Sequence, residues 1–219
     1  MNATSPISRR VLAGLAALVF SFAAAAASAE TAPPKPEGET DMAKALAAGP
    51  LPELSVGDKA GVPVIEYGSV TCTHCAHFDK DVWPAIKQAY VDTGKIRYIF
   101  REYSRNPLDV GAFMLARCEG DDKALATIEL LFATQDKWAF IDKPLDGLVD
   151  VLKPTGMTRD KIEACLKDQA KADALVEIVK TADQNFAVKG TPTFIIDGKI
   201  YGGALSKDDL DAILKPLIK

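Results

Sequence analysis

The chain has 219 residues, of which 48% are apolar and 26% charged, a composition typical of a soluble globular protein. This length is enough for one or two domains, and the composition excludes disorder, collagen and coiled coil for the bulk of the chain. Thirty Asp and Glu oppose 26 Lys and Arg, and the net charge of −4 argues against a nucleic-acid partner. Four cysteines are enough for one redox pair and one structural bridge, or for a single metal site.

The first 29 residues are typical of a cleaved signal peptide. Arg9 and Arg10 form a positive n-region, residues 11–27 are almost wholly apolar, and residues 27–29 (ASA) match a signal-peptidase site. An uncleaved membrane anchor is the alternative, but the apolar run is short for a span of about 20 residues. Residues 8–12 also resemble a twin-arginine signal. The sequence therefore predicts export to the periplasm by the Sec or the twin-arginine route, into a compartment where cysteines normally form disulfides.

Residues 30–50 are predicted to be a flexible leader. Residues 30–39 hold three prolines and no large apolar residue, which is the composition of a linker. Within the leader, residues 41–48 are expected to form two helical turns before Gly49 and Pro50.

Residues 62–103 have the pattern of a strand, a helix and a second strand. An apolar run over residues 62–67 predicts the first strand, and residues 96–103 alternate as the second. Between them, residues 72–90 carry an apolar stripe of helical period, which Pro84 is expected to kink. This order implies a parallel βαβ pair.

The pattern changes to helical periodicity from residue 107 to residue 186. Helices are predicted over residues 108–118, 123–135, 145–152, 159–166 and 170–186. Strands return at residues 193–196 and 199–201, separated by the hairpin signal Asp197-Gly198. A capping-box pattern at Ser206 and Asp209 then opens a final helix.

The order of these elements predicts an α/β protein with a thioredoxin-like fold and an inserted all-helical domain. The first part of the thioredoxin-like domain is expected over residues 51–103 and its second part over residues 187–219. The helical insertion domain is expected over residues 104–186.

Cys72-Thr73-His74-Cys75 is a C-x-x-C motif that follows a predicted strand and opens a helix. A cysteine at a helix N-terminus faces unpaired backbone N–H groups and the positive end of the helix dipole, which stabilise its thiolate. His74 lies between the two sulfurs and adds a further donor. Because a stabilised thiolate favours the reduced pair, the disulfide of such a pair is a strong oxidant. The motif therefore predicts thiol–disulfide exchange.

Zinc and haem sites are the alternatives for this motif. A zinc site would use Cys72, Cys75, His77 and one distant ligand, but the sequence has no second C-x-x-C and no H-x-x-x-H. Haem attachment requires His directly after the second cysteine, and residue 76 is Ala. We therefore expect no metal and no cofactor.

Thr191 and Pro192 stand directly before the strand predicted at residues 193–196. A proline at the first residue of a strand is ordinary. In a thioredoxin-like fold with a C-x-x-C motif, however, the Thr191–Pro192 bond is expected to be cis and to lie beside the redox pair. Backbone at that point is available for an extended substrate peptide to pair with.

The motif, the helical insertion, the Thr-Pro pair and the signal together resemble the DsbA family of periplasmic thiol-disulfide oxidoreductases over residues 51–219. Residues 100–103 (FREY), 114–118 (MLARC) and 135–138 (QDKW) are similar to its alphaproteobacterial branch. The resemblance implies that Cys72 is the attacked, low-pKa cysteine, with Cys75 as its buried partner and His74 tuning the pair. It also implies that Thr191 and Pro192 border the substrate groove.

The resemblance also bears on Glu66 and on the other two cysteines. The family keeps a buried acid six residues before its first active-site cysteine, so Glu66 is a candidate proton relay to Cys75; an ordinary solvent-facing acid is the alternative. Cys118 and Cys165 are expected to form a structural disulfide, as is frequent in this branch, and two buried free thiols are the alternative. Thr73 replaces the proline of the enteric motif, which puts the oxidising strength in question.

The sequence thus favours a monomeric protein dithiol oxidase. Its implied partners are unfolded secreted proteins with free thiols and a DsbB-type membrane reoxidant, with no nucleic acid. One alternative is a disulfide isomerase or reductase of the copper-sensitivity-suppressor type, but residues 41–48 are too short for the trimerising stalk of those proteins. The other alternative is a non-catalytic thiol module that binds copper or peptides.

Overall fold

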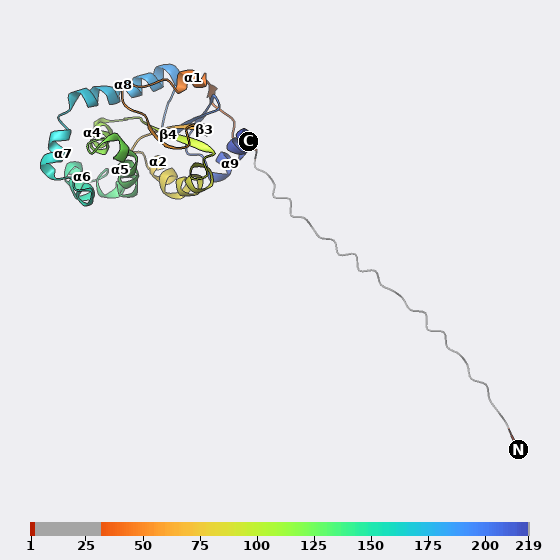
Figure 1. The fold of residues 1–219 in the computed structure, drawn as a ribbon. Coiled ribbons are helices and arrows are strands. Elements are labelled where there is room, and N and C mark those ends of the chain that lie inside the picture. Colours follow the sequence, from red (N-terminus) through yellow and green to blue (C-terminus); the bar gives the residue numbers. More distant parts are fainter. Residues whose placement is uncertain (3–31, 219) are drawn as a thin grey trace. The chain divides into compact units, whose positions relative to one another are not determined.

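The buried apolar run of β3 (Val62–Gly68) lies at the centre of the sheet in a computed structural model of the chain, which describes residues 1–2 and 32–218 (Figure 1). The predicted signal peptide falls largely in residues 3–31 and so lies outside the described residues. In the described part of the chain, no helix is both long and apolar enough to cross a membrane.

The described strands form one mixed sheet in the order β1-β6-β5-β3-β4-β2. Only β3 and β4 pair in parallel, as the βαβ pattern predicts, and the other neighbours are antiparallel. The remaining strands are β1 (Gly38–Glu39), β2 (Leu54–Gly57), β4 (Ile96–Glu102), β5 (Thr193–Ile196) and β6 (Lys199–Gly202).

The helices lie close to their predicted positions. They are α1 (Met42–Ala45), α2 (Thr73–His77), α3 (Trp83–Ile86), α4 (Pro107–Ala116), α5 (Asp121–Ala133), α6 (Pro144–Leu152), α7 (Arg159–Cys165), α8 (Gln169–Phe186) and α9 (Lys207–Leu214). The predicted capping box is present at the start of α9, where the Asp209 N–H donates to Ser206 Oγ and the Ser206 N–H donates to the Asp209 carboxylate.

The helix predicted over residues 72–90 is present as one helical run in which α-helical and π-helical segments alternate. A π-helical turn (Phe78–Val82) joins α2 to α3, and a second one (Lys87–Val91) follows α3. Pro84, which has no N–H to donate, is the second residue of α3 and so lies just after the first π-helical turn.

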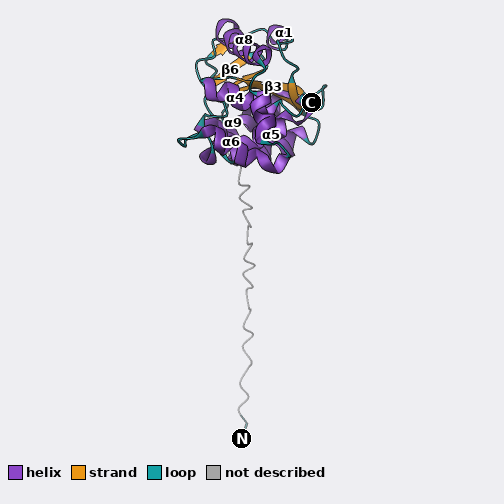
Figure 2. Cartoon of the chain, turned by 90° about the vertical axis from the view of Figure 1, so that its left-hand side faces the viewer, coloured by secondary structure: helices purple, strands orange, loops and turns teal. Residues whose placement is uncertain are grey.

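Helices cover both faces of the sheet. In Figures 1 and 2, α1 and α8 lie over one face, α2 and α9 lie against the other, and α4 to α7 gather at one side. The helices between β4 and β5 are the predicted insertion, so the fold is thioredoxin-like with inserted helices. From residue 32 onward the described chain packs as one compact unit. The domain boundaries at 103/104 and 186/187 therefore remain a proposal, which rests on the order of the elements along the chain.

The structure differs from the predicted flexible leader over residues 30–50, because residues 38–39 form a strand and residues 42–45 form a helix. Gly38 and Glu39 form β1, which pairs with Ile200 and Lys199 at the edge of β6. The strand forms because the open edge of β6 offers backbone partners to a chain of any composition. The helix predicted at 41–48 is present but shorter, and the Asp41 side chain caps its first turn.

Strand β2 is absent from the sequence-based prediction. It is four residues long and pairs with β4 between Leu54 and Gly57, where Gly57 adopts a φ of 101°. Proline on one side and this left-handed glycine on the other give the segment the composition of a turn, so only the alternation of Leu54 and Val56 marks the strand.

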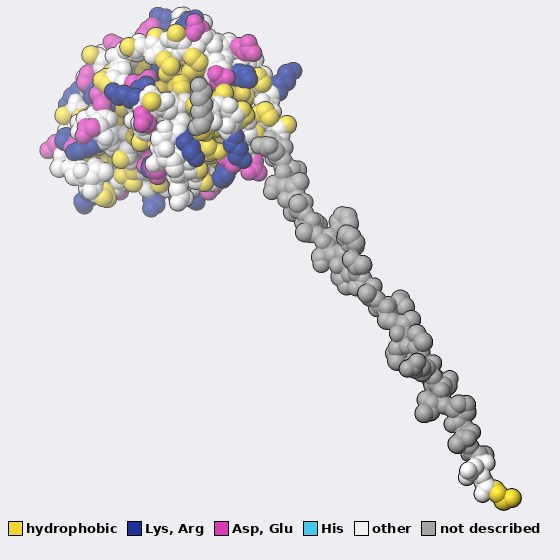
Figure 3. Space-filling model, turned by 45° about the vertical axis from the view of Figure 1, so that its right-hand side comes forward, with side chains coloured by type: hydrophobic (Ala, Val, Ile, Leu, Met, Phe, Trp, Pro, Cys, Tyr) yellow, Lys and Arg dark blue, Asp and Glu magenta, His cyan; other side chains and the backbone are white. Residues whose placement is uncertain are grey.

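The surface carries charges of both signs. On the face drawn in Figure 3, Lys and Arg side chains lie among Asp and Glu, and hydrophobic side chains gather near its centre. A mixed surface of this kind fits the small net charge of the chain.

Candidate active site

Cys72 lies at the N-cap of α2, at the end of a short loop that leaves β3. Its backbone is extended, with φ −88° and ψ 121°, and the helix begins at the next residue. Cys72 and Cys75 are both free thiols and both buried, so the structure shows the pair in its reduced form. The sequence-predicted motif is therefore in its predicted place, between a central strand and a helix N-terminus.

The surroundings of Cys72 lower the pKa of its thiol to about 5. The largest cause is the hydrogen bond from the Cys75 thiol, and the Thr191 side chain and the backbone N–H groups of Cys75 and His74 act in the same direction. Burial raises the pKa of Cys72, but its effect is smaller than that of the hydrogen bonds together. At neutral pH Cys72 is therefore a thiolate, the form that attacks and that leaves in disulfide exchange.

Cys75 has the opposite environment. It is fully buried, and burial, the hydrogen bond to Cys72 and the nearby charge of Glu66 all raise the pKa of its thiol. Cys75 therefore stays protonated while Cys72 is ionised, and a Cys75 thiolate that forms during exchange must take up a proton quickly.

His74 is exposed, between the two cysteines. Its backbone N–H contributes to the low pKa of Cys72. Within the described residues, the imidazole donates no hydrogen bond to either sulfur. The main contribution of residue 74 in this structure therefore comes from its amide, whereas the sequence suggested the side chain.

Thr191 and Pro192 lie beside the thiol pair. Their peptide bond is cis, as predicted, and Cys72 Sγ lies 3.2 Å from the Thr191 carbonyl oxygen, to which it donates a hydrogen bond only while it is protonated. The Thr191 hydroxyl is buried and has no hydrogen-bond partner in the described part of the chain. The loop before β5 thus places one carbonyl against the reactive sulfur, although residues 72 and 191 are far apart in sequence.

Glu66 is buried in the middle of β3, with 1% of its surface exposed, so the solvent-facing alternative is wrong. Its one described hydrogen bond comes from the Tyr98 hydroxyl, at 2.6 Å from Oε2. Burial raises the pKa of Glu66 to about 8, against the lowering effect of Tyr98, and the charges of Asp79 and Cys72 raise it further. Glu66 therefore holds a proton at neutral pH, close to Cys75.

Tyr98 also lines a small cavity. It has a volume of about 20 Å³, room for one water molecule, and its lining includes Asp79, Trp83 and Glu129. Burial and the charge of Glu129 raise the pKa of Asp79 to about 7. The sequence favoured a solvated side chain for Asp79, because a single Asp on a helix carries no signal of burial.

The loop between β3 and α2 is held by two side chains that sequence reasoning did not assign. Asp109, at the start of α4, accepts hydrogen bonds from Ser69 and Thr71. Gln135, in a 3₁₀ turn after α5, donates to the carbonyls of Val70 and Cys72. Both residues belong to the helical insertion.

Cys118 and Cys165 form the predicted disulfide, with their Cα atoms 5.9 Å apart. It joins the C-terminal end of α4 to the last residue of α7, so it lies within the helical insertion. Of the four cysteines, two are therefore oxidised and structural in position, and two are reduced at the helix N-terminus.

No part of the described chain gathers three or more His, Cys, Asp or Glu residues as metal ligands. His77, the third ligand of the zinc alternative, is exposed and lies 3.1 Å from Asp81 on the next turn. These contacts give the zinc alternative no support.

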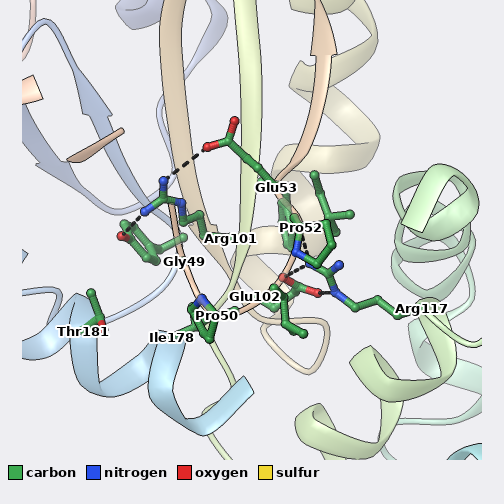
Figure 4. Close-up of a pocket in the computed structure, with 13 residues that line it drawn as sticks. Gly49, Pro50, Pro52, Glu53, Arg101, Glu102, Arg117, Ile178 and Thr181 are labelled. Atoms are coloured by element: carbon green, nitrogen blue, oxygen red, sulfur yellow. Dashed lines mark hydrogen bonds and ion pairs between the residues drawn. The ribbon is translucent and has the colours of Figure 1, made fainter. Parts of the chain in front are cut away.

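A second cavity lies beside α8, and its lining holds none of the four active-site residues Cys72, Cys75, Thr191 and Pro192 (Figure 4). Its volume of about 40 Å³ is enough for a few water molecules. In Figure 4, Arg117 points at Glu102 and Arg101 points at Glu53. The charged side chains around this cavity are thus paired with each other, which is the pattern of a structural site.

Comparisons with known proteins agree with this geometry. A family model described as thioredoxin matches residues 52–216. A protein of Rickettsia bellii named "putative protein-disulfide oxidoreductase" is 34% identical over 153 residues, which are 67% of this chain and 57% of that protein. A Rickettsia conorii protein named in the same way is also 34% identical, over 64% of this chain and 51% of that protein. The chain thus spans about half the length of the curated relatives that it matches.

Solved structures extend the likeness to the whole fold. The crystal structure of alpha-DsbA1 from Wolbachia pipientis superposes with a TM-score of 0.70 at 28% identity, over 77% of this chain and 92% of that one. BdbD from Bacillus subtilis, at a TM-score of 0.66 and 18% identity, shares the fold.

Proposed function

The chain belongs to the thioredoxin family and to its DsbA type, and we propose that it is a protein dithiol oxidase. In this proposal the oxidised Cys72–Cys75 pair donates its disulfide to secreted proteins that carry free thiols. The relatives named as protein-disulfide oxidoreductases support this reaction type.

The observation that carries the proposal is the asymmetry of the two thiols. The pKa of Cys72 is lowered to about 5, whereas that of Cys75 is raised. Hydrogen bonds to the Cys72 thiolate exist only when the pair is reduced, so they stabilise the dithiol relative to the disulfide. The disulfide is therefore a strong oxidant, despite the Thr73 that replaces proline in the motif.

The reaction has two exchange steps. A substrate thiolate attacks Cys72 Sγ of the oxidised pair; the Cys72–Cys75 bond breaks and Cys75 leaves as a thiolate. A second substrate thiolate then attacks the substrate sulfur of the mixed disulfide, and Cys72 leaves as a thiolate. The substrate loses two electrons and gains a disulfide, and the protein gains both electrons as a dithiol.

The residues around the pair have separate tasks in these steps. Glu66 is protonated at neutral pH and supplies the proton that the departing Cys75 thiolate needs. The N–H groups at the start of α2 stabilise Cys72 when it leaves. Backbone at Thr191 and Pro192 borders the groove in which an extended substrate peptide lies beside the sulfur.

Location and partners form part of the proposal. The signal-like residues 1–29 support export to the periplasm. In that compartment, unfolded proteins would supply the thiols and a DsbB-type membrane protein would take the two electrons from the dithiol. A monomeric state is part of the proposal, and a sedimentation measurement checks it.

The test is the equilibrium of the Cys72–Cys75 pair with glutathione in the purified protein, with the Cys118–Cys165 disulfide intact. We expect a reduction potential near about −120 mV, as in strong dithiol oxidants, and rapid oxidation of a dithiol peptide. A value near about −270 mV, the range of thioredoxin, would make the chain a reductase or isomerase. No turnover together with tight Cu(I) binding would instead indicate a copper-binding thiol module.

A further inference from the structure

The loop between β3 and α2, residues 69–72, takes its side-chain hydrogen bonds from the helical insertion. Ser69 is fully buried and Cys72 nearly so. The loop has one internal backbone bond, from the Cys72 N–H to the Ser69 carbonyl at 3.0 Å. Apart from the contact between their own hydroxyls, the described hydrogen bonds to the side chains of Ser69 and Thr71 all involve residues 106–109.

Asp109 is the centre of the first contact. Its carboxylate accepts from the Ser69 hydroxyl at 2.9 and 3.0 Å, from the Thr71 N–H at 2.9 Å and from the Thr71 hydroxyl at 3.0 Å. The Arg105 N–H donates to it as well, at 2.9 Å, and Asn106 caps the helix by accepting from the Asp109 N–H. A fully buried carboxylate surrounded only by donors therefore fixes Ser69 and Thr71, three residues and one residue before the reactive cysteine.

Gln135 makes the second contact. Its Nε2 donates to the Val70 carbonyl at 2.7 Å and to the Cys72 carbonyl at 3.1 Å. The Cys72 carbonyl also accepts the first bond of the helix, from the Ala76 N–H at 3.1 Å. Gln135 is buried in the 3₁₀ turn that follows α5, and α5 packs against α2 (Figure 1). One side chain therefore fixes the peptide groups before and after the thiol.

We propose that Asp109 and Gln135 are positioning residues through which the helical insertion sets the oxidising power of the Cys72–Cys75 pair. They hold the loop so that the first N–H groups of α2 point at Cys72 Sγ. This inference rests on the proposed function, because it assigns a task within the same exchange reaction.

The effect of the two contacts differs between the redox states. In the dithiol form, the N–H groups stabilise a full negative charge on Cys72 Sγ, and this interaction depends on their direction. In the disulfide form, that sulfur is neutral and bonded to Cys75, so the same misalignment costs little. Loosening the loop should therefore destabilise the dithiol more than the disulfide, and the disulfide should become a weaker oxidant.

The first variant is Gln135→Met, which keeps the length of the side chain and removes both donors. We expect the equilibrium constant for oxidation of glutathione by the protein disulfide to fall about three- to tenfold, the effect of losing about one hydrogen bond. The pKa of Cys72, measured from the ultraviolet absorbance of its thiolate, should rise in parallel.

Thr134→Val is the matched control. Thr134 is the neighbour of Gln135, and its hydroxyl donates to the Leu130 carbonyl at 2.7 Å, within the end of α5 itself. The control loses one hydrogen bond in the same turn without touching the loop. We expect its glutathione equilibrium to stay within twofold of the wild type.

Asp109→Asn is the second variant, in which an amide N–H₂ faces donors that the carboxylate accepted. We expect a shift of the glutathione equilibrium in the same direction. Unfolding in urea is measured for both redox forms of each variant. A purely structural role lowers the stability of both forms equally, whereas the proposed role lowers that of the dithiol more.

Two results would overturn the inference. One is an unchanged glutathione equilibrium in Gln135→Met together with an unchanged pKa of Cys72. The other is an equal loss of stability in both redox forms of the variants. Neither depends on Asp109→Asn being soluble, since Gln135→Met suffices. A wild-type protein with a thioredoxin-like potential would instead refute the proposed oxidase function, and the variants could still shift that potential.

Discussion

Two buried glutamates on neighbouring strands have opposite fates. Glu66 in β3 and Glu102 in β4 each expose 1% of their surface. Glu102 pairs in register with Gly68, two residues beyond Glu66, so the alternation of a strand directs both side chains to the same face of the sheet. Position and burial therefore do not distinguish them.

The partners of the two carboxylates differ. Arg117 donates to Glu102 through Nε at 2.5 Å and through Nη2 at 2.9 Å, as Figure 4 shows, so this carboxylate is held as an ion pair. Glu66 receives one neutral donor, the Tyr98 hydroxyl, and burial raises its pKa to about 8. A buried carboxylate that pairs with a guanidinium stays ionised and contributes to stability. A buried carboxyl without such a partner keeps its proton at neutral pH and can give it to a neighbour.

The largest effect is expected from breaking the ion pair. Arg117→Met leaves Glu102 as an uncompensated buried charge and removes a donor from the Pro52 carbonyl. We expect the free energy of unfolding to fall by about 3–5 kcal/mol, measured by urea denaturation. Lys123→Met, which removes an exposed contact with Glu119, serves as the control and should change stability by less than about 1 kcal/mol. A loss in Arg117→Met as small as in this control would contradict the ion-pair assignment.

The second effect separates the two acids by rate. In Glu66→Gln, no protonated carboxyl remains to neutralise the departing Cys75 thiolate. We expect oxidation of a dithiol peptide at pH 7 to slow about tenfold to hundredfold, measured by stopped-flow fluorescence. The same substitution at Glu102 is the matched control, since it should lower stability and leave the rate per folded molecule unchanged. Equal slowing in both variants would show that the effect of Glu66 is structural.

The third effect is a pH dependence of stability in the oxidised protein, where Cys72 has no proton to lose. The pKa of Glu66 is about 8 in the folded reduced protein, and burial keeps it raised above the usual 4.5 of the unfolded chain in the oxidised protein, which lacks the charge of Cys72. Between these values the folded state binds more protons, so stability falls as the pH rises from about 4.5 to 8, by at most about 1.4 kcal/mol per pH unit. Asp79, with its pKa raised to about 7, contributes with the same sign.

Glu66→Gln sharpens this measurement. The variant loses the contribution of one proton, so its stability should fall less steeply with pH than that of the wild type. Denaturation curves of the oxidised protein between pH 4.5 and 8 test this. A variant slope as steep as the wild-type slope would assign the titration to Asp79 or to another group.

The sequence predicts the fold well where the pattern is long and local. The strands at β3 and β4 and the helices from α4 to α8 follow from apolar periodicity and caps, and Thr158 caps α7 as an N-cap residue is expected to. The C-x-x-C motif predicts Cys72 and Cys75 because their chemistry depends on two cysteines that are separated by only two residues. By contrast, β1 and β2 are short edge strands. They form because of the strands with which they pair, and their own residues do not predict them.

The contacts around the thiols could not be predicted in the same way. Asp109 follows a proline at a helix start, where an acid is common for capping alone, and nothing local points to Ser69 some 40 residues away. Gln135 belongs to a stretch that marks the alphaproteobacterial branch, yet its bonds to two backbone carbonyls leave no pattern in the sequence. Such contacts depend on how the helical insertion packs against the loop before Cys72, and only the tertiary structure shows this.

The pairing of β1 with β6 has a consequence for aggregation, because it covers an edge of the sheet. Glu37, Gly38 and Glu39 occupy the backbone of an edge that β6 would otherwise present to solvent. An exposed edge is a template on which another chain can add a strand, and the secreted chains that this protein would meet are unfolded. Residues 37–39 therefore protect the edge of β6. A protease that removes only residues before 37 leaves this protection in place. A cut beyond residue 39 exposes the backbone of β6 to the unfolded chains that are the proposed substrates.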